Sequence, residues 1–392
     1  MKSFYLALLS SATFILSPIA LAEELSPLKI GVIATYSGPY ADYGRQFDAG
    51  MALYLDESKG KLGGREVEII RKDSGGPAPD KARRFAQELI SRDKVDIITG
   101  LDFSPNVYAI APLVTRAKIP TLVMNAASSA ITEASPYIAR FSFTVQQVSA
   151  PMAEWLAKNE VASIYTVVAD YASGLDAEES FKKTFEEKGG KVVGSVRTPM
   201  NNPDFSAYVQ RIKDTKPEAV FIFFPSGVMP LSFLRAWQER GMDEAGIKLY
   251  ATGEATDDSY MKATGAAAKG LITSHHYSYA HDSEKNKQFV ETYEKKYGTA
   301  ERLNYFSVAA YDSLAALDKA LTATGGQASG DAVLEQLKGM RLESPRGPIE
   351  IDAKTRDIIQ TVYIREVQEQ EGALVSVEFE QFDRVKDPAK EK

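Results

Sequence analysis

Six short clusters of polar and aromatic residues each follow an apolar run that reads as a strand. Hydroxyl and amide groups in such loops can hydrogen-bond a small anion, and tyrosine rings can enclose its apolar part. Ligands of open parallel sheets bind outside the carboxyl ends of the strands, so clusters at equivalent positions should line one cleft. The clusters occupy residues 36–40, 101–104, 125–129, 170–171, 225–227 and 253–254.

The sequence lacks the common motifs of catalysis and cofactor binding. It contains no Gly-x-Gly-x-x-Gly that opens a helix, no Walker loop and no Gly-x-Ser-x-Gly turn. Three histidines exist, at 275, 276 and 281, and adjacent strand residues point to opposite faces, so the first two are poor joint metal ligands. Asp257 and Asp258 suit a helix N-cap better than an acid–base pair. We therefore expect no enzyme activity, no metal and no cofactor.

Two successive doubly wound α/β units are predicted to position these clusters. Strand-like runs occur at 29–34, 67–71, 95–99 and 121–124, and again at 163–168, 191–196, 219–224 and 248–252. Helical spacing of apolar residues occurs between them at 43–57, 80–91 and 106–117, and at 176–188, 206–213 and 230–240. This alternation predicts parallel sheets that are covered by helices on both faces.

The chain is expected to pass between the two units three times. Residues 136–147 join the first unit to the second, and residues 271–279 lead back. We predict lobe one from residues 23–143 and 277–354, and lobe two from residues 144–276 and 355–384. Two lobes with several crossovers make a hinge and a cleft. The charged residues 385–392 are expected to be disordered.

Residues 1–22 are predicted to be a secretory signal peptide. Lys2 carries the only charge, residues 4–16 form an apolar run too short to span a bilayer, and small residues stand at 20 and 22. The remaining chain has no cysteine and no second long apolar stretch, which favours a soluble periplasmic monomer. The net charge of −7 argues against a nucleic-acid partner.

Several motifs recur in order along the chain. They are residues 29–32 running into 37–44, Gly63-Gly64-Arg65, residues 100–104, residues 126–128 followed by Thr132, and residues 170–174. From about residue 28 to 382 the chain resembles the leucine/isoleucine/valine-binding type of periplasmic solute-binding proteins of ABC importers. The resemblance implies a type I fold of two α/β lobes, with three crossovers and a cleft that closes on its ligand.

The resemblance also implies roles for individual residues. Ser104 and Ser128 match the hydroxyl donors that hold a ligand carboxylate, and Ala126 matches a backbone contact beside them. Tyr43 matches an aromatic wall in lobe one, and Tyr171 matches an aromatic lid from lobe two. The physical chemistry agrees, because hydroxyls and helix N-termini stabilise a carboxylate and tyrosine rings enclose apolar groups.

A further set of residues bears on whether the ligand carries an amino group. Glu254 matches, within one position, the acid that pairs with the ammonium group of an amino acid. The sequence departs from the family around Ser226 and around His276, and together with Phe103 these residues are further candidate contacts. The departures favour a non-amino aromatic acid or a 2-oxo acid, while a branched-chain amino acid stays open.

The expected function is therefore solute capture outside the cytoplasm. We expect the solute-binding component of an ABC importer, which captures a small apolar organic carboxylate by hinge closure and delivers it to a membrane permease. We expect no direct membrane insertion. A sensor that presents its ligand to a membrane receptor would have the same cleft, and a secreted enzyme on this fold is a third alternative. A repressor of this fold would need a helix-turn-helix where the signal peptide stands.

Overall fold

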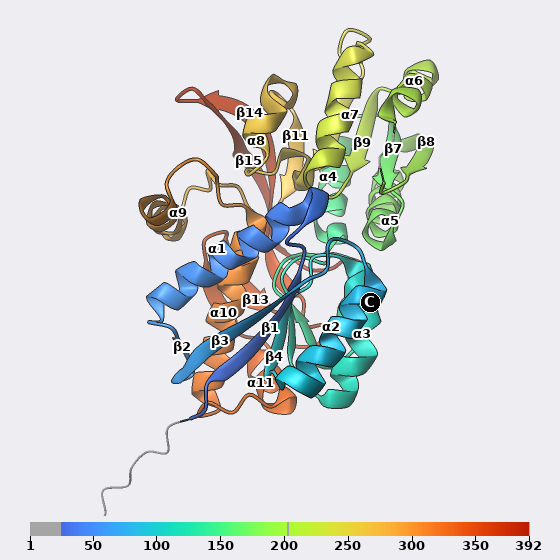
Figure 1. Ribbon diagram of the computed structural model, residues 1–392. Helices are drawn as coiled ribbons and strands as arrows, with labels where there is room; N and C mark the ends of the chain where they lie inside the picture. The colour runs from blue at the N-terminus through green and yellow to red at the C-terminus, as the bar shows by residue number, and fades with distance from the viewer. Residues whose placement is uncertain (1–24, 202–203, 392) are drawn as a thin grey trace, which may run out of the picture.

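The computed structural model describes residues 25–201 and 204–391, which form two α/β lobes (Figure 1). The predicted signal peptide lies outside the described residues. Within the described ranges, no helix combines the length and the apolar character that a bilayer crossing requires. The two-lobed α/β fold that the sequence predicts is confirmed.

Lobe one is built on a six-stranded sheet with the order β2-β3-β1-β4-β5-β6. Its strands are β1 (Leu28–Ala34), β2 (Lys61–Leu62), β3 (Arg65–Asp73), β4 (Ile97–Gly100), β5 (Thr121–Val123) and β6 (Ile138–Arg140). All pairings except that of β2 are parallel, so the carboxyl ends meet at one edge. Its helices are α1 (Ala41–Glu57), α2 (Pro79–Glu88), α3 (Ser104–Ala117), α9 (Glu284–Tyr297), α10 (Tyr305–Ala323) and α11 (Gly330–Leu337).

The helices of lobe one cover both faces of its sheet. Helices α1 and α10 pack together on one face of the sheet, and α2 and α3 pack together on the other face (Figure 1). Six of the seven residues of β1 are buried, as expected for a parallel strand with both faces covered. This double cover leaves only the strand ends free to form a site.

Lobe two repeats the plan around parallel strands with the order β8-β7-β9-β10-β11. These strands are β7 (Ser163–Ala169), β8 (Lys191–Thr198), β9 (Ala219–Phe223), β10 (Lys248–Thr252) and β11 (Ile272–His275). Its helices are α4 (Val145–Lys158), α5 (Ala172–Glu187), α6 (Phe205–Thr215), α7 (Val228–Glu239) and α8 (Met261–Thr264). Antiparallel strands β12 (Arg341–Ser344), β13 (Gly347–Ile351), β14 (Ile358–Gln370) and β15 (Ala373–Val385) continue this sheet, and β12 and β13 lie on the lobe-one side (Figure 1).

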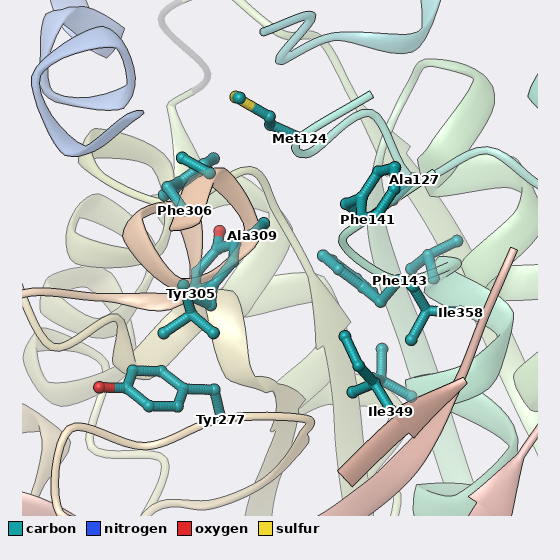
Figure 2. Packing of buried hydrophobic residues seen from close by; sticks show 14 of the residues in the cluster. Met124, Ala127, Phe141, Phe143, Tyr277, Tyr305, Phe306, Ala309, Ile349 and Ile358 are labelled. Atoms are coloured by element: carbon teal, nitrogen blue, oxygen red, sulfur yellow. The ribbon is translucent and has the colours of Figure 1, made fainter. Parts of the chain in front are cut away.

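The chain crosses between the lobes after β6, after β11 and along β14. Strand β14 pairs with β13 at its start and with β11 further on, so one strand links the two lobes. At the first crossover, Thr144 and Gln147 form a reciprocal capping box, which fixes where α4 begins. An apolar cluster continues through this region, where Phe143 packs edge-on against Tyr305 at the start of α10 and Phe141 lies beside Ala127 (Figure 2).

The C-terminal segment differs from the disorder that its charge predicts. Strand β15 returns the chain to lobe one, and the residues after it lie against that lobe (Figure 1). The Ser129 hydroxyl donates to Asp387, which is only 3% exposed. Lys390 forms an ion pair with Asp357 at 2.7 Å. The charges of this segment have buried partners far away in sequence, which composition alone cannot reveal.

Candidate functional site

A small cavity of about 20 Å³ lies between the lobes, where the carboxyl ends of both parallel sheets face each other. Six aromatic residues line it: Tyr43, Phe103, Phe143, Tyr171, Phe223 and Tyr305. The other lining residues are Asp102, Asn125, Ala127, Ser173, Pro225, Ser226 and Glu254. A wider hollow of about 410 Å³ lies at the amino ends of β10 and β11, which is the opposite edge of the sheet from the one where ligands of this fold bind.

Hydrogen bonds between the lobes hold the cavity closed. The Tyr43 hydroxyl from α1 donates to the Ser226 carbonyl oxygen at 2.8 Å. The hydroxyl oxygens of Ser104 and Ser173, at the first turns of α3 and α5, lie 3.0 Å apart. Both contacts join lobe one to lobe two at the cavity itself, so the structure represents a closed state of the hinge.

Ser128 takes part in closure rather than in the cavity lining. Its hydroxyl donates to the Asp176 carboxylate on α5 at 2.7 Å, and the Ser129 N–H donates to the same carboxylate at 2.9 Å. The hydroxyl oxygen also lies 2.8 Å from that of Tyr108. Because the Ser128 hydroxyl is committed to these partners, its position differs from the ligand-facing position that the resemblance implies.

The nine residues singled out from the sequence fall into two groups. Five line the cavity: Tyr43, Phe103, Tyr171, Ser226 and Glu254. Four lie directly behind the lining: Ser104, Ala126, Ser128 and His276. The ring of His276 packs on the cavity residue Phe143 with 4.9 Å between centroids, and its burial lowers its pKa well below the usual range. His276 is therefore a neutral backing residue in this closed state.

Aromatic pairs on the two lobes form opposing walls. In lobe one, Tyr43 and Phe103 are stacked with centroids 5.6 Å apart and an interplanar angle of 23°. In lobe two, Tyr171 and Phe223 are stacked with centroids 6.1 Å apart and an angle of 20°. Such walls favour a planar apolar group, because aromatic rings gain energy from offset or edge contacts with another ring.

A strained turn after β4 places the Asp102 carboxyl in the cavity wall. Gly100 and Leu101 both have left-handed φ angles, of 89° and 62°. A side chain at Gly100 would meet the Ile33 carbonyl oxygen at 2.6 Å, so this turn requires glycine. Asp102 Oδ2 accepts a hydrogen bond from the Thr35 N–H at 2.7 Å. Burial raises the pKa of the Asp102 carboxyl to about 6.

Glu254 follows β10 in a short 3-10 turn and is 4% exposed. Burial raises the pKa of its carboxyl to about 7, although the nearby Arg365 acts in the opposite direction. His275 Nε2 lies 3.9 Å away, but burial holds the pKa of that histidine well below its usual range, so the pair is not an ion pair at neutral pH. A side chain at Gly253 would collide with both His275 and Arg365. Glu254 is therefore a buried carboxyl with a raised pKa in the lobe-two wall of the cavity.

The N-termini of three helices supply partial positive charge at the cavity. No lysine or arginine is among the residues that line it in the described part of the chain. Helices α3, α5 and α7 all begin beside the lining, at Ser104, Ala172 and Val228. First-turn N–H groups have no partner within their own helix and carry partial positive charge, so they can hold a carboxylate. Within the described ranges, no cluster of three or more His, Asp or Glu side chains is arranged for a metal.

Sequence reasoning missed several lining residues. Phe143 lies in the first crossover, and Tyr305 starts α10 directly after its N-cap Asn304. Asp102 and Asn125 stood in two of the strand-end clusters but were not selected as contacts. An aromatic residue at a predicted crossover is the signal that could have identified Phe143, because crossovers form the floor of a two-lobed cleft.

Comparisons with known proteins agree with this geometry. Residues 27–373 match the family model described as periplasmic binding protein. The chain is 38% identical over 384 residues to the Leu/Ile/Val-binding protein homolog 6 of Brucella melitensis, covering 98% of both chains. Two solved structures from Rhodopseudomonas palustris are also similar.

The first is a solute-binding protein of an ABC transporter from strain BisB5, in complex with 3,4-dihydroxybenzoic acid. It is 44% identical with a TM-score of 0.89, and the match covers 93% of this chain and 99% of that chain. The second, in complex with 4-hydroxybenzoate, is 41% identical with a TM-score of 0.91 and the same coverage. The chain therefore belongs to the periplasmic binding protein family.

Proposed function

We propose that this solute-binding component of an ABC importer captures a monocyclic aromatic carboxylate between its lobes. The observation that carries the proposal is the cavity itself, with stacked aromatic pairs on both lobes and, among the residues that the structure describes, no cationic side chain in its lining. The complexes of the two Rhodopseudomonas palustris proteins with hydroxybenzoates support the same ligand class.

The ligand ring lies between the walls formed by Tyr43 with Phe103 and by Tyr171 with Phe223. Its carboxylate faces the first turns of α3 and α5, where the Ser173 hydroxyl adds a donor. Each charge-assisted hydrogen bond contributes roughly 1.5–3 kcal/mol, and each aromatic contact about 0.5–1.5 kcal/mol beyond the area that it buries. The ligand binds while the cleft is open, and closure around it adds the contacts of both aromatic walls.

The proposal places the protein in the periplasm as a monomer that delivers its ligand to a membrane permease. Residues 1–22 are removed on export, so sequencing of the exported protein should begin at Glu23. An exported protein that retains Met1 would contradict this part of the proposal.

Calorimetric titration of ligand-stripped protein tests the ligand class. Benzoate, 4-hydroxybenzoate, phenylpyruvate and leucine are added separately to the same preparation. At least one benzoate should bind tightly, because a planar ring suits the walls, and leucine should bind weakly. Tight binding of leucine alone would favour the branched-chain amino acid alternative, and the absence of heat from all four ligands would reject the apolar carboxylate class.

A further inference from the structure

Three buried acceptor oxygens in the cavity lining have no hydrogen-bond partner. They are Asp102 Oδ1 and Asn125 Oδ1 in lobe one and Glu254 Oε2 in lobe two, judged within residues 25–201 and 204–391. Nearly all buried polar atoms in native proteins are paired, so acceptors left open at a cavity point to a partner supplied by the ligand.

At neutral pH the open oxygens of the lobe-one pair act as acceptors, because the Asp102 carboxyl is then largely ionised. The Asn125 amide Nδ2 donates to the Asp102 carbonyl oxygen at 2.8 Å, which fixes the orientation of the amide and leaves Oδ1 as its open atom. The Thr35 N–H occupies Asp102 Oδ2, which leaves Oδ1 open in turn. Asn125 is therefore held on the backbone of Asp102, and both residues line the cavity on the lobe-one side.

We propose that Asp102 and Asn125 form a subsite that accepts a hydrogen bond from a hydroxyl on the ligand ring. The inference rests on the proposed function and narrows it, because it makes the protein selective for hydroxylated aromatic acids over benzoate itself. Lobe one then binds the hydroxyl substituent of the ring, and the aromatic walls of both lobes bind the ring itself.

The chemistry of this subsite excludes the ligand carboxylate. Two acceptor oxygens repel a carboxylate, and the donors that suit it lie elsewhere, at the Ser173 hydroxyl and the first turns of α3 and α5. A phenolic hydroxyl donates one hydrogen bond and carries no charge, so it satisfies an open acceptor without the cost of burying an ion. A ligand without this donor leaves both acceptors unpaired, and sites built around a hydroxyl reject such analogues strongly.

Wild-type protein titrated with benzoate, 3-hydroxybenzoate, 4-hydroxybenzoate and 3,4-dihydroxybenzoate gives the first test. The best hydroxylated ligand should bind at least about tenfold more tightly than benzoate. The ring position of the preferred hydroxyl then reports the orientation of the ring in the cavity. Equal affinity for benzoate and all three hydroxylated acids would overturn the subsite while leaving the proposed function intact. Failure of every aromatic acid to bind would instead reject the proposed function.

The Asp102→Asn variant gives the second test. The Thr35 N–H still requires an oxygen, so the new amide turns its Nδ2 toward the cavity and replaces an acceptor with a donor. The preference for the hydroxylated ligand should fall at least about tenfold, while benzoate affinity changes less than about threefold. The matched control is Asp331→Asn, an exposed aspartate of lobe one that pairs with Lys118.

Two outcomes of the variant would contradict the subsite. An equal loss for benzoate and the hydroxylated acids would show a general effect on closure. Tighter binding of benzoate would show that the carboxylate faces Asp102. If Asp102→Asn does not fold, Asn125→Ala removes the second acceptor and should lower the same preference. Unchanged preference in a folded Asn125→Ala protein would also overturn the proposal.

Discussion

The two lobes contribute different kinds of polar group to the same cavity. Lobe one presents acceptor oxygens that the backbone holds in place, since Asp102 is fixed by Thr35 and Asn125 is fixed by Asp102. Lobe two presents a carboxyl, Glu254, whose pKa burial raises to about 7, and the N-terminus of α5. The comparison suggests a division of work, in which lobe one selects the ligand and lobe two balances its charge as the cleft closes.

Removal of the lobe-two aromatic wall should have the largest effect on binding. Tyr171→Ala deletes the ring that stacks on Phe223 and encloses the ligand. Affinity for the aromatic ligand should fall by about 2–3 kcal/mol, measured by calorimetric titration, because a large desolvated aromatic contact is lost. Tyr208→Ala is the control, since that ring packs on Phe205 away from the cavity. Similar losses in both variants would contradict an enclosing role for Tyr171.

The pH dependence of binding should report the carboxyl of lobe two. Burial raises the pKa of Glu254 to about 7, and an anionic ligand favours the neutral form of this carboxyl. Affinity should therefore be nearly constant near pH 5–6 and fall as the pH rises through 7. For one group with a pKa near 7, the loss between pH 6 and pH 8 is roughly tenfold. Affinity that rises over this range would contradict the assignment of charge.

Burial raises the pKa of Asp102 to about 6 and that of Glu254 to about 7, and these two shifts determine the sign of a stability effect. Their folded-state pKa values lie above those of the unfolded chain, so the folded protein binds more protons between about pH 4 and pH 7. The contribution of these groups to the free energy of unfolding should fall as the pH rises through that window. Chemical denaturation of ligand-free protein at pH 5 and pH 7.5 measures it, with Asp102→Asn and Glu254→Gln as the variants that should reduce the difference.

Weakening the contact between the lobes should have a smaller effect that all ligands share. Asp176 accepts hydrogen bonds from the Ser128 hydroxyl and the Ser129 N–H, so Asp176→Asn and Ser128→Ala should shift the hinge toward opening. Each should weaken every ligand by about 1 kcal/mol, with a larger radius of gyration at subsaturating ligand in small-angle scattering. The control is Asp214→Asn, which changes an exposed residue of α6. A loss for only one ligand would place Ser128 at the ligand after all.

The fold could be predicted because buried parallel strands leave a plain record in sequence. All five residues of β9 are buried, and they read as one apolar run. Strand β15 was missed because it alternates apolar and charged residues along a partly exposed edge, where the pattern resembles a polar linker. The C-terminal segment was missed for a related reason, since Asp387 and Lys390 are paired with charges and hydroxyls of lobe one.

The sequence predicts which loops form the site, but not which of their side chains face the cavity. The rule for strand ends located the right segments, because both sheets are parallel and their carboxyl ends converge. Which side chain faces the cavity depends on the turn geometry after each strand and on the opposite lobe. The left-handed turn at Leu101 brings Asp102 into the wall, and Asp176 draws the Ser128 hydroxyl out of it. Neither effect is visible in a single sequence.

Glu254→Gln should have the smallest effect on an aromatic ligand, and it separates the charge of lobe two from the selection by lobe one. At pH 6 the Glu254 carboxyl is largely neutral, because burial raises its pKa to about 7, so the amide is a close substitute. Affinity for hydroxybenzoates at pH 6 should change by less than about threefold, and at pH 8 the variant should bind more tightly than wild type, since it cannot ionise.

Glu369→Gln, an exposed acid of β14 that pairs with Lys269, is the matched control and should change neither value. An amino-acid ligand would give the opposite result. Its ammonium group would lose its counter-charge in a desolvated cavity, so Glu254→Gln would cost several kcal/mol at both pH values. Loss of affinity at pH 8 as well as at pH 6 would therefore show that Glu254 binds an amine of the ligand directly. Lobe two, rather than lobe one, would then select the ligand.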